Sequence, residues 1–278
     1  MIKIAELVPF IERALSDIDT TLYIPRVRQR GATVPLPWRL AAVIWFSASG
    51  MSRWKPYVNL LLPMWLSKYK LSYSQWSFWR KELAALVQVL AEVTCIKSAY
   101  RGVALVDSTC LPVCAIQRER DHKCFAKHAS KGHGSLGWFF GFKLHLVTSD
   151  TGEILRFWLS TGKVHDTAPL FHVNFMQGLQ GLLVGDSGYR VGKKRADGVA
   201  RNSGLALIAR PVGVEDKDMP WTLRSLFKDR WRIETVFDEL KDACGLNFAR
   251  RCKTLETLQV VVHSSLIAYT AARCLAPS

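Results

Sequence analysis

The sequence has 278 residues, of which 49% are apolar, enough for the core of one large domain or of two modest ones. Its formal net charge is +15, and both parts of the chain are basic, since residues 1–100 hold 13 Lys or Arg against 6 Asp or Glu. This charge favours a polyanionic partner, and its even spread argues against a basic low-complexity tail.

The cysteine count and the lengths of the apolar runs indicate in which cellular compartment the protein works. Seven cysteines are an odd number in a chain too large to need disulfide bonds for its stability, which indicates a reducing cytosol. The longest apolar runs, Leu40–Ser47 and Tyr57–Leu66, are too short to span a bilayer. Glu6 and Glu12 interrupt any signal-peptide core. We therefore expect a cytoplasmic protein with no membrane partner.

The first third of the chain is predicted to be helical. One short helix is expected around Ile4–Leu15, and several more over residues 38–96. Ser72 or Ser74 can cap the last of these helices. Between the first helix and the rest lies a basic turn that contains Arg26, Arg28 and Arg30.

Tryptophans alternate with cations through this helical region. The residues concerned are Trp38, Arg39, Trp45, Arg53, Trp54, Lys55, Trp65, Lys68, Lys70, Trp76, Trp79, Arg80 and Lys81. The pattern suits an all-helical DNA-binding module of the helix-turn-helix type. The alternative is a helical cap whose tryptophans are core residues and whose cations face solvent. We predict that residues 1–96 form an N-terminal DNA-binding region.

From residue 102 the pattern changes to strands. Val103–Val106 is a short apolar run of the buried kind, and Asp107 ends it. Gly181–Gly185 is a second such run, and Asp186 ends it. Each aspartate is therefore predicted to lie at the end of a buried strand.

A hairpin is predicted between these two strands. A polar loop over residues 117–134 leads into Phe139–Thr148, and Glu153–Leu159 returns after an Asp-Thr-Gly turn. Lys143 and His145 share one face of the first hairpin strand, where they could approach a phosphate or lie half-exposed.

Alternating helices and strands complete the second part of the chain. Asp166 is placed to cap a helix that begins after His165. Arg190–Ser203 is predicted to be a basic helix, whose cations either follow a DNA backbone or face solvent, and Leu205–Arg210 is the last strand.

We predict that residues 227–241, FKDRWRIETVFDELK, form one helix that carries charged residues beside its apolar stripe. Phe227, Arg230, Glu234 and Lys241 fall on one side of it, next to an apolar stripe. The plain interpretation is an exposed salt-bridged face, because Arg230 and Glu234 are i,i+4 partners.

The amino-acid sequence of this stretch resembles the YREK signature of bacterial insertion-sequence transposases of the DDE class. The core RWxIExxFxxLK is complete, and Phe227 stands where the family has Tyr, so that hydroxyl is missing here. The resemblance covers residues 102–275 well and residues 35–96 loosely. It implies that Glu234 is the third metal-binding acid and that two aspartates precede it at strand ends, which Asp107 and Asp186 satisfy.

The resemblance also sets the expected fold. Three strands in hairpin series followed by alternation match a ribonuclease-H-like α/β fold, a mixed sheet with flanking helices, preceded here by the all-helical N-terminal region. Residues 97–278 are then the catalytic domain. In this fold the strands before Asp107 and Asp186 are neighbours, so the three carboxylates should converge.

Catalysis is expected to need Mg²⁺ or Mn²⁺, with two ions held by Asp107, Asp186 and Glu234. The resemblance implies that Arg230 and Lys241 contact DNA, that the partner is double-stranded DNA at element ends and target, and that a homodimer forms on it. The expected reaction is cutting and joining of insertion-sequence ends. The alternatives are a ribonuclease-H-like nuclease without strand transfer and a domesticated DNA-binding protein.

Overall fold

The computed structural model describes residues 3–24, 34–49, 57, 64, 66, 72–96, 100–135, 137–172 and 175–275. The chain divides into two compact units: Met1–Thr94 together with Asp238–Ser278, and Cys95–Phe237. Part of the predicted basic and tryptophan-rich pattern lies outside the described residues, namely Arg26, Arg28, Arg30, Arg53, Trp54, Lys55, Trp65, Lys68 and Lys70. DNA binding by residues 1–96 and catalysis by residues 97–278 stay predictions.

The first unit is helical where it is described. Its main helices are α1 (Ile4–Leu15), α3 (Leu36–Ala48), α6 (Tyr73–Glu82), α7 (Ala84–Ile96) and α11 (Leu255–Leu275). Helix α1 has the predicted bounds, and Ser72 caps α6 through a hydrogen bond that its hydroxyl accepts from the backbone of Gln75. The single helix predicted from Ser74 onward is instead two helices, α6 and α7, because the helix is interrupted at Leu83.

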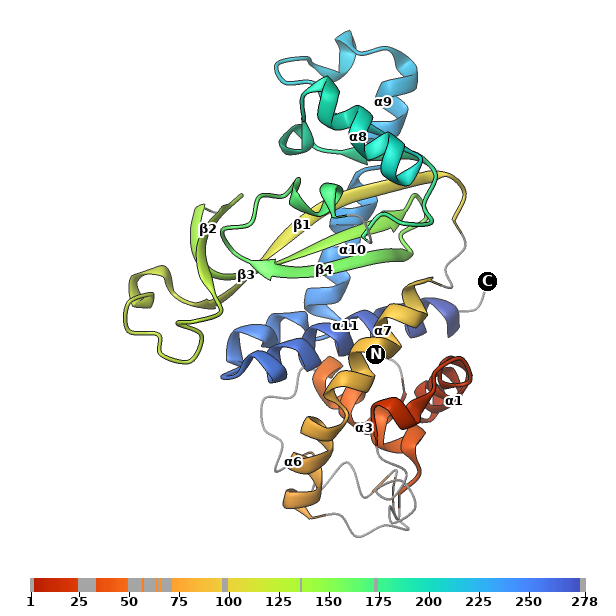
Figure 1. Cartoon of the computed structure of the whole chain (residues 1–278), viewed down its shortest axis with the longest axis vertical. Helices are drawn as coiled ribbons and strands as arrows, with labels where there is room; N and C mark the ends of the chain where they lie inside the picture. Colours follow the sequence, from red (N-terminus) through yellow and green to blue (C-terminus); the bar gives the residue numbers. More distant parts are fainter. Residues whose placement is uncertain are drawn as a thin grey trace. The chain divides into compact units, whose positions relative to one another are not determined.

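Helix α11 is the longest helix described and packs beside α3 (Figure 1). By length and composition it could cross a membrane, but 72% of its most apolar window is buried inside the protein. That burial is the pattern of a core helix, which is apolar on all sides because it is surrounded.

Several of the predicted tryptophan and basic positions belong to this core. Trp76 and Trp79 are buried, and Trp76 packs edge-on against Phe46. Arg39 is buried as well and faces Glu82, with their side chains 3% and 4% exposed and the closest nitrogen and oxygen 3.7 Å apart. The interpretation as a helical cap is therefore right in making these two tryptophans core residues, and wrong in expecting Arg39 to face solvent.

We expect Arg39→Met to lower the free energy of unfolding by about 3–5 kcal/mol, because it removes the cation that faces a buried carboxylate. Replacing both partners, Arg39→Met with Glu82→Leu, should recover most of that loss. Urea unfolding followed by tryptophan fluorescence measures both. Lys81→Met, an exposed change on α6, is the matched control; a loss as large in the control would contradict the buried-pair explanation.

The second unit is built on a mixed six-stranded sheet. Its strands are β1 (Val103–Cys114), β2 (Ser130–Gly134), β3 (Gly137–Ser149), β4 (Ile154–Thr161), β5 (Gly181–Gly185) and β6 (Leu205–Ala209). The order is β2-β3-β1-β5-β6, and β4 also pairs with β3. Strands β1 and β5 run parallel, as do β5 and β6, while β3 is antiparallel to β1, β2 and β4. The predicted ribonuclease-H-like fold is confirmed.

Two strands differ from their predicted extent. Strand β1 does not end at Asp107 but continues to Cys114, because β3 pairs with it along almost its whole length (Figure 1). The polar loop predicted over residues 117–134 contains β2, which lacks any apolar alternation. There a Cβ at Gly132 would overlap the backbone of Gly162, so this strand needs a small residue rather than a large apolar one.

Helices and short turns flank the sheet. They include η4 (Ala168–Phe171), η5 (Ser187–Tyr189), α8 (Lys193–Ser203), α9 (Trp221–Lys228) and α10 (Trp231–Asp242). One buried core lies on the face of β1 that carries Ala104 and Val106, where Leu170, Phe175 and Tyr189 also pack. Because successive residues of a strand point to opposite faces, Asp107 belongs to the other face.

Candidate active site

Asp107 and Asp186 each directly follow the stretch over which the neighbouring strands β1 and β5 pair in parallel. The last paired residues of β1 and β5 are Val106 and Gly185, so each aspartate is the next residue on its strand. Residues at matching positions of paired strands point to the same face, and both carboxylates therefore belong to the face opposite the buried core. Gly185 has no side chain because a Cβ there would meet the Tyr189 ring at 2.8 Å.

Local hydrogen bonds hold each carboxylate to the chain that follows it. Asp107 Oδ1 accepts from the backbone N–H of Ser108 at 2.7 Å. Asp186 Oδ1 accepts from the backbone N–H of Gly188 at 2.9 Å and so caps η5. A hydrogen bond within β1 thus orients the Asp107 carboxylate, and the turn after β5 orients that of Asp186.

Asp107 is a partly buried acid with a raised pKa. Burial raises the pKa of Asp107 from 3.8 to about 6, and the charge of Asp186 raises it as well. The N–H of Ser108 and the charge of Arg230 act the other way. Asp107 is thus ionised at neutral pH at a cost that a nearby cation would relieve.

Arg230 connects Asp107 to Glu234. One guanidinium nitrogen donates to Asp107 Oδ2 at 3.2 Å and the other donates to Glu234 Oε1 at 2.6 Å. Arg230 and Asp107 are about one-fifth exposed, whereas the Glu234 side chain is 56% exposed. The predicted i,i+4 pair is confirmed, and its arginine also reaches an acid on the sheet.

The prediction of one helix over residues 227–241 is wrong. Helix α9 ends at Lys228 and α10 begins at Trp231, so Phe227 and Glu234 lie on different helices. Backbone hydrogen bonds from Arg230 to Phe227 and from Arg232 to Asp229 tighten the chain at the break. Arg230 therefore lies in the junction, from which it contacts Asp107.

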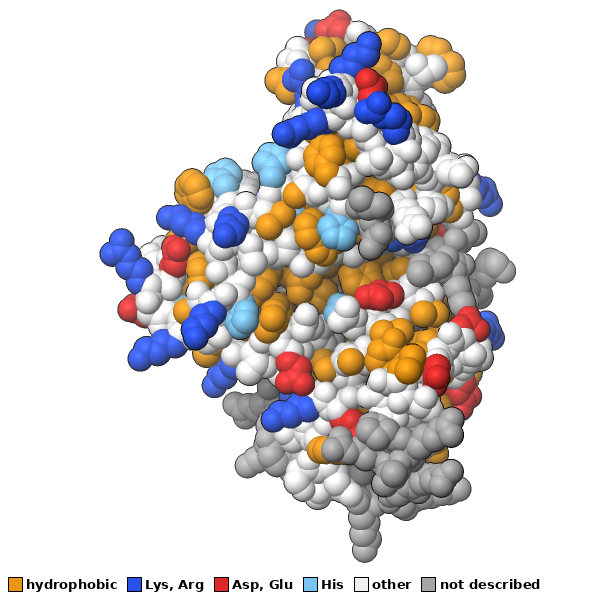
Figure 2. Space-filling view, in the orientation of Figure 1, with side chains coloured by type: hydrophobic (Ala, Val, Ile, Leu, Met, Phe, Trp, Pro, Cys, Tyr) orange, Lys and Arg blue, Asp and Glu red, His pale blue; other side chains and the backbone are white. Residues whose placement is uncertain are grey.

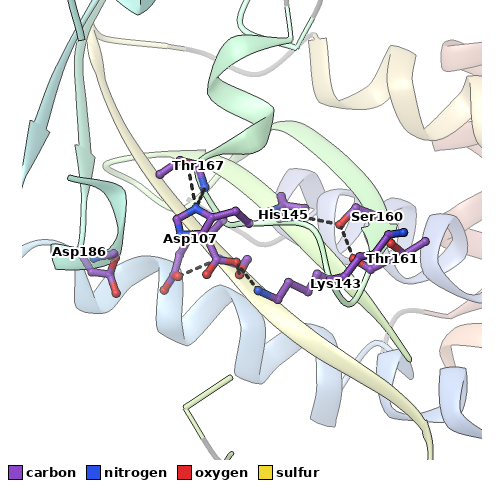
Figure 3. A network of polar contacts seen from close by, with 12 residues as sticks. Asp107, Lys143, His145, Ser160, Thr161, Thr167 and Asp186 are labelled. Carbon is purple, nitrogen blue, oxygen red and sulfur yellow. Dashed lines mark hydrogen bonds and ion pairs between the residues drawn. The ribbon is translucent and has the colours of Figure 1, made fainter. Parts of the chain in front are cut away.

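The structure brings the three predicted acids to one part of the unit but does not form them into a compact cluster. Within the described ranges, no three His, Cys, Asp or Glu side chains are close enough to hold a metal together. Asp186 stands apart from the polar network around Asp107 (Figure 3). Three unpaired carboxylates repel one another, and here the Arg230 guanidinium lies between two of them.

Lys241, the other predicted DNA contact, lies seven positions after Glu234 on α10. That spacing places it on the same side of the helix, two turns further on. It falls in the segment that belongs to the first unit.

A second group of polar residues, which includes Lys143 and His145 in Figure 3, is connected to Asp107 through Ser108. The Ser108 hydroxyl donates to Asp166 Oδ1 at 2.6 Å, and Lys143 Nζ donates to the same oxygen at 2.9 Å. His145 Nε2 lies 2.7 Å from the Ser160 hydroxyl.

Three predictions for this group are corrected. Asp166 does not cap a helix, because only the short η4 follows it and its carboxylate faces Ser108 and Lys143 instead. Lys143 and His145 are not half-exposed but buried, at 5% and 0%. Burial lowers the pKa of His145 to about 4, so this ring is neutral. The alternation of side chains along β3 predicted that Lys143 and His145 share one face of the sheet. It could not show that other parts of the chain cover that face as well.

The fold and this arrangement agree with a comparison against protein families. Residues 97–254 match the family described as the transposase DDE domain, which is more than half of the chain. No curated protein matches the sequence. The chain therefore belongs to the DDE transposases, a class of enzymes that act on DNA.

Proposed function

We propose that this protein is an insertion-sequence transposase of the YREK-signature type, of bacterial origin, that cuts the ends of its own element and joins them to target DNA. Water first attacks a phosphodiester and leaves a 3′-hydroxyl, which then attacks a target phosphodiester at the same site. The observation that carries the proposal is the placement of Asp107 and Asp186 directly after the last paired residues of the adjacent parallel strands β1 and β5, with Glu234 linked to Asp107 through Arg230.

The donor set suits a hard divalent cation. Asp107 and Asp186 supply carboxylate oxygens from one edge and one face of the sheet, the ligand type that Mg²⁺ and Mn²⁺ prefer. The raised pKa of Asp107 fits such a site, because a cation would favour its ionised form. Asp107, Asp186 and Glu234 would hold one or two ions, which supply charge for activating the attacking oxygen and stabilising the leaving one.

Arg230 supplies the positive charge that the chain itself places at this site. Its guanidinium neutralises Asp107 and Glu234 and lies where an anionic phosphodiester has to approach two acids. A bidentate donor of this kind can pair with carboxylate or phosphate. We assign Arg230 to phosphate binding, together with Lys241 further along α10.

Exposed cations elsewhere on the second unit provide further contacts for a DNA backbone. In Figure 2, Lys and Arg gather over the end of the unit that carries α8 and along the segment that leads into β2. The exposed residues include Arg118, Arg120, Lys123, Lys127, Arg190, Lys193, Lys194 and Arg195. Contacts of this kind bind DNA without regard to sequence.

The remaining assignments follow from the same proposal. We assign the recognition of element ends to residues 1–96. A homodimer would pair two element ends, and the protein would act in the cytoplasm, on the nucleoid. A nuclease without strand transfer and a domesticated DNA-binding protein are the competing functions, and the assay below separates them.

We expect purified full-length protein to nick DNA carrying the element's terminal inverted repeats in Mg²⁺, and to join the freed 3′ ends to a target plasmid. Excess EDTA should abolish both products and leave gel retardation of the DNA in place, since binding depends on cations of the protein. DNA without the repeats is the control. Nicking without joining would favour the nuclease, and retardation with no cleavage would favour the binding protein.

A further inference from the structure

Ser108, Lys143 and Asp166 form a cluster on the face of the sheet opposite Asp107. In the antiparallel pairing of β1 with β3, Ser108 faces His145 and Cys110 faces Lys143, so these side chains share one face. Asp107 is paired with Leu146 and points to the other face. The cluster is therefore not part of the group of acids itself.

Ser108 connects the two faces. Its backbone N–H donates to Asp107 Oδ1 at 2.7 Å, and its hydroxyl donates to Asp166 Oδ1 at 2.6 Å. Asp166 is 58 positions away along the chain, so this contact fixes Ser108 from outside its own strand. Any shift of Ser108 would move the hydrogen-bond donor that orients the Asp107 carboxylate.

Lys143 supplies the positive charge of the cluster. Its side chain is 7% exposed, and its ammonium lies 2.9 Å from Asp166 Oδ1. Although burial acts to raise it, the pKa of Asp166 is lowered by hydrogen bonds from Ser108 and Lys143 and by the charge of Lys143. Asp166 is thus held as an anion that the buried ammonium of Lys143 keeps in place.

We propose that Ser108 and Asp166 are positioning residues for Asp107, with Lys143 as the buried counter-charge that fixes Asp166. They act through the strand backbone and touch neither substrate nor ion. The inference rests on the proposed function, in which Asp107 binds a divalent cation. Groups that orient a ligand typically change metal affinity or activity by about 10–100-fold when they are removed.

Ser108→Ala tests the link, because it removes the bond to Asp166 and leaves the Lys143–Asp166 pair intact. Mn²⁺ binding to the full-length protein without DNA, followed by electron paramagnetic resonance, should weaken about 10-fold or more. Ser160→Ala is the matched control: its hydroxyl also makes a short hydrogen bond on this face, but to His145. Its Mn²⁺ affinity should stay within about 2-fold of wild type, and Ser108→Thr, which keeps the hydroxyl, should restore binding.

A second measurement covers the charged pair. The double variant Asp166→Asn with Lys143→Met avoids a buried unpaired charge, and adding Ser108→Ala to it should cause little further loss, since the residues act as one unit. Equal Mn²⁺ affinities for Ser108→Ala and Ser160→Ala would overturn the proposal, as would a wild-type protein that binds no Mn²⁺. If wild type binds Mn²⁺ with this order of variants but never nicks DNA, the proposed function fails while the positioning role stands.

Discussion

Asp107→Asn should reduce both DNA cleavage and strand joining by about 100-fold or more, while the protein should still retard DNA in a gel. The change is nearly isosteric but removes one anionic ligand and the charge that a divalent ion would balance. Asp197→Asn, an exposed change of equal charge on α8, is the control and should leave both activities intact. A variant at Asp107 that still nicks at the wild-type rate would remove this residue from the catalytic site.

The same variant should be more stable than wild type at high pH. The folded pKa of Asp107 is raised above its unfolded value, to about 6. Below pH 4 both states hold the proton; as pH rises from 4 to 6 only the unfolded state loses it, so wild-type stability falls. Asparagine cannot ionise and escapes that cost.

Urea unfolding in EDTA therefore should show Asp107→Asn gaining about 1–3 kcal/mol over wild type at pH 8 and clearly less at pH 5. EDTA keeps bound cations from adding their own stabilisation. An equal loss of stability at both pH values would mean that the Arg230 contact outweighs the burial of the charge. Lost activity with raised stability is the pattern of a functional residue kept at an energetic cost.

Glu234→Gln should reduce nicking and joining by about 100-fold with almost no effect on folding. The glutamine keeps an oxygen for Arg230 and removes the charge. Because the Glu234 side chain is 56% exposed, the free energy of unfolding should change by no more than about 0.5 kcal/mol. The measurement pairs Mg²⁺-dependent nicking of element-end DNA with urea unfolding.

Asp238→Asn is the matched control for Glu234, since it is an exposed acid one turn further along α10. It should leave cleavage, DNA binding and stability unchanged. If Glu234→Gln behaves like this control, the carboxylate serves only in an exposed ion pair with Arg230, and the third acid has to be sought elsewhere. If it also loses DNA binding, its role is not limited to the cation.

Local patterns were enough to predict much of the fold. The apolar spacing of Ile4–Leu15 gave α1, and the apolar run Gly181–Gly185 gave β5 with its bounds. The Asp-Thr-Gly turn gave the β3–β4 hairpin. In each case the signal lies within one element, because period and turn chemistry are properties of neighbouring residues.

Three features of the fold leave no clear pattern in the sequence, and the predictions for them were wrong or absent. Strand β2 was missed because its five residues are SKGHG, which have no alternation and are held by pairing with β3 alone. The break between α9 and α10 was missed because both sides of it favour helix. Burial of Lys143 and His145 depends on what covers the second face of the sheet, which their own strand does not encode.

The sequence by itself determined that Asp107 and Asp186 each follow a short buried strand segment, and it gave the i,i+4 pair of Arg230 with Glu234, but its prediction that a strand ends at Asp107 was wrong. Only the tertiary structure decided that Arg230 also reaches Asp107, 123 positions away, and that Ser108 is tied to Asp166. The physical reason is that hydrogen bonds and ion pairs act over a few ångströms in space. Sequence periodicity fixes which way a side chain points within its element, whereas sheet pairing and the helix junction decide which distant group it meets.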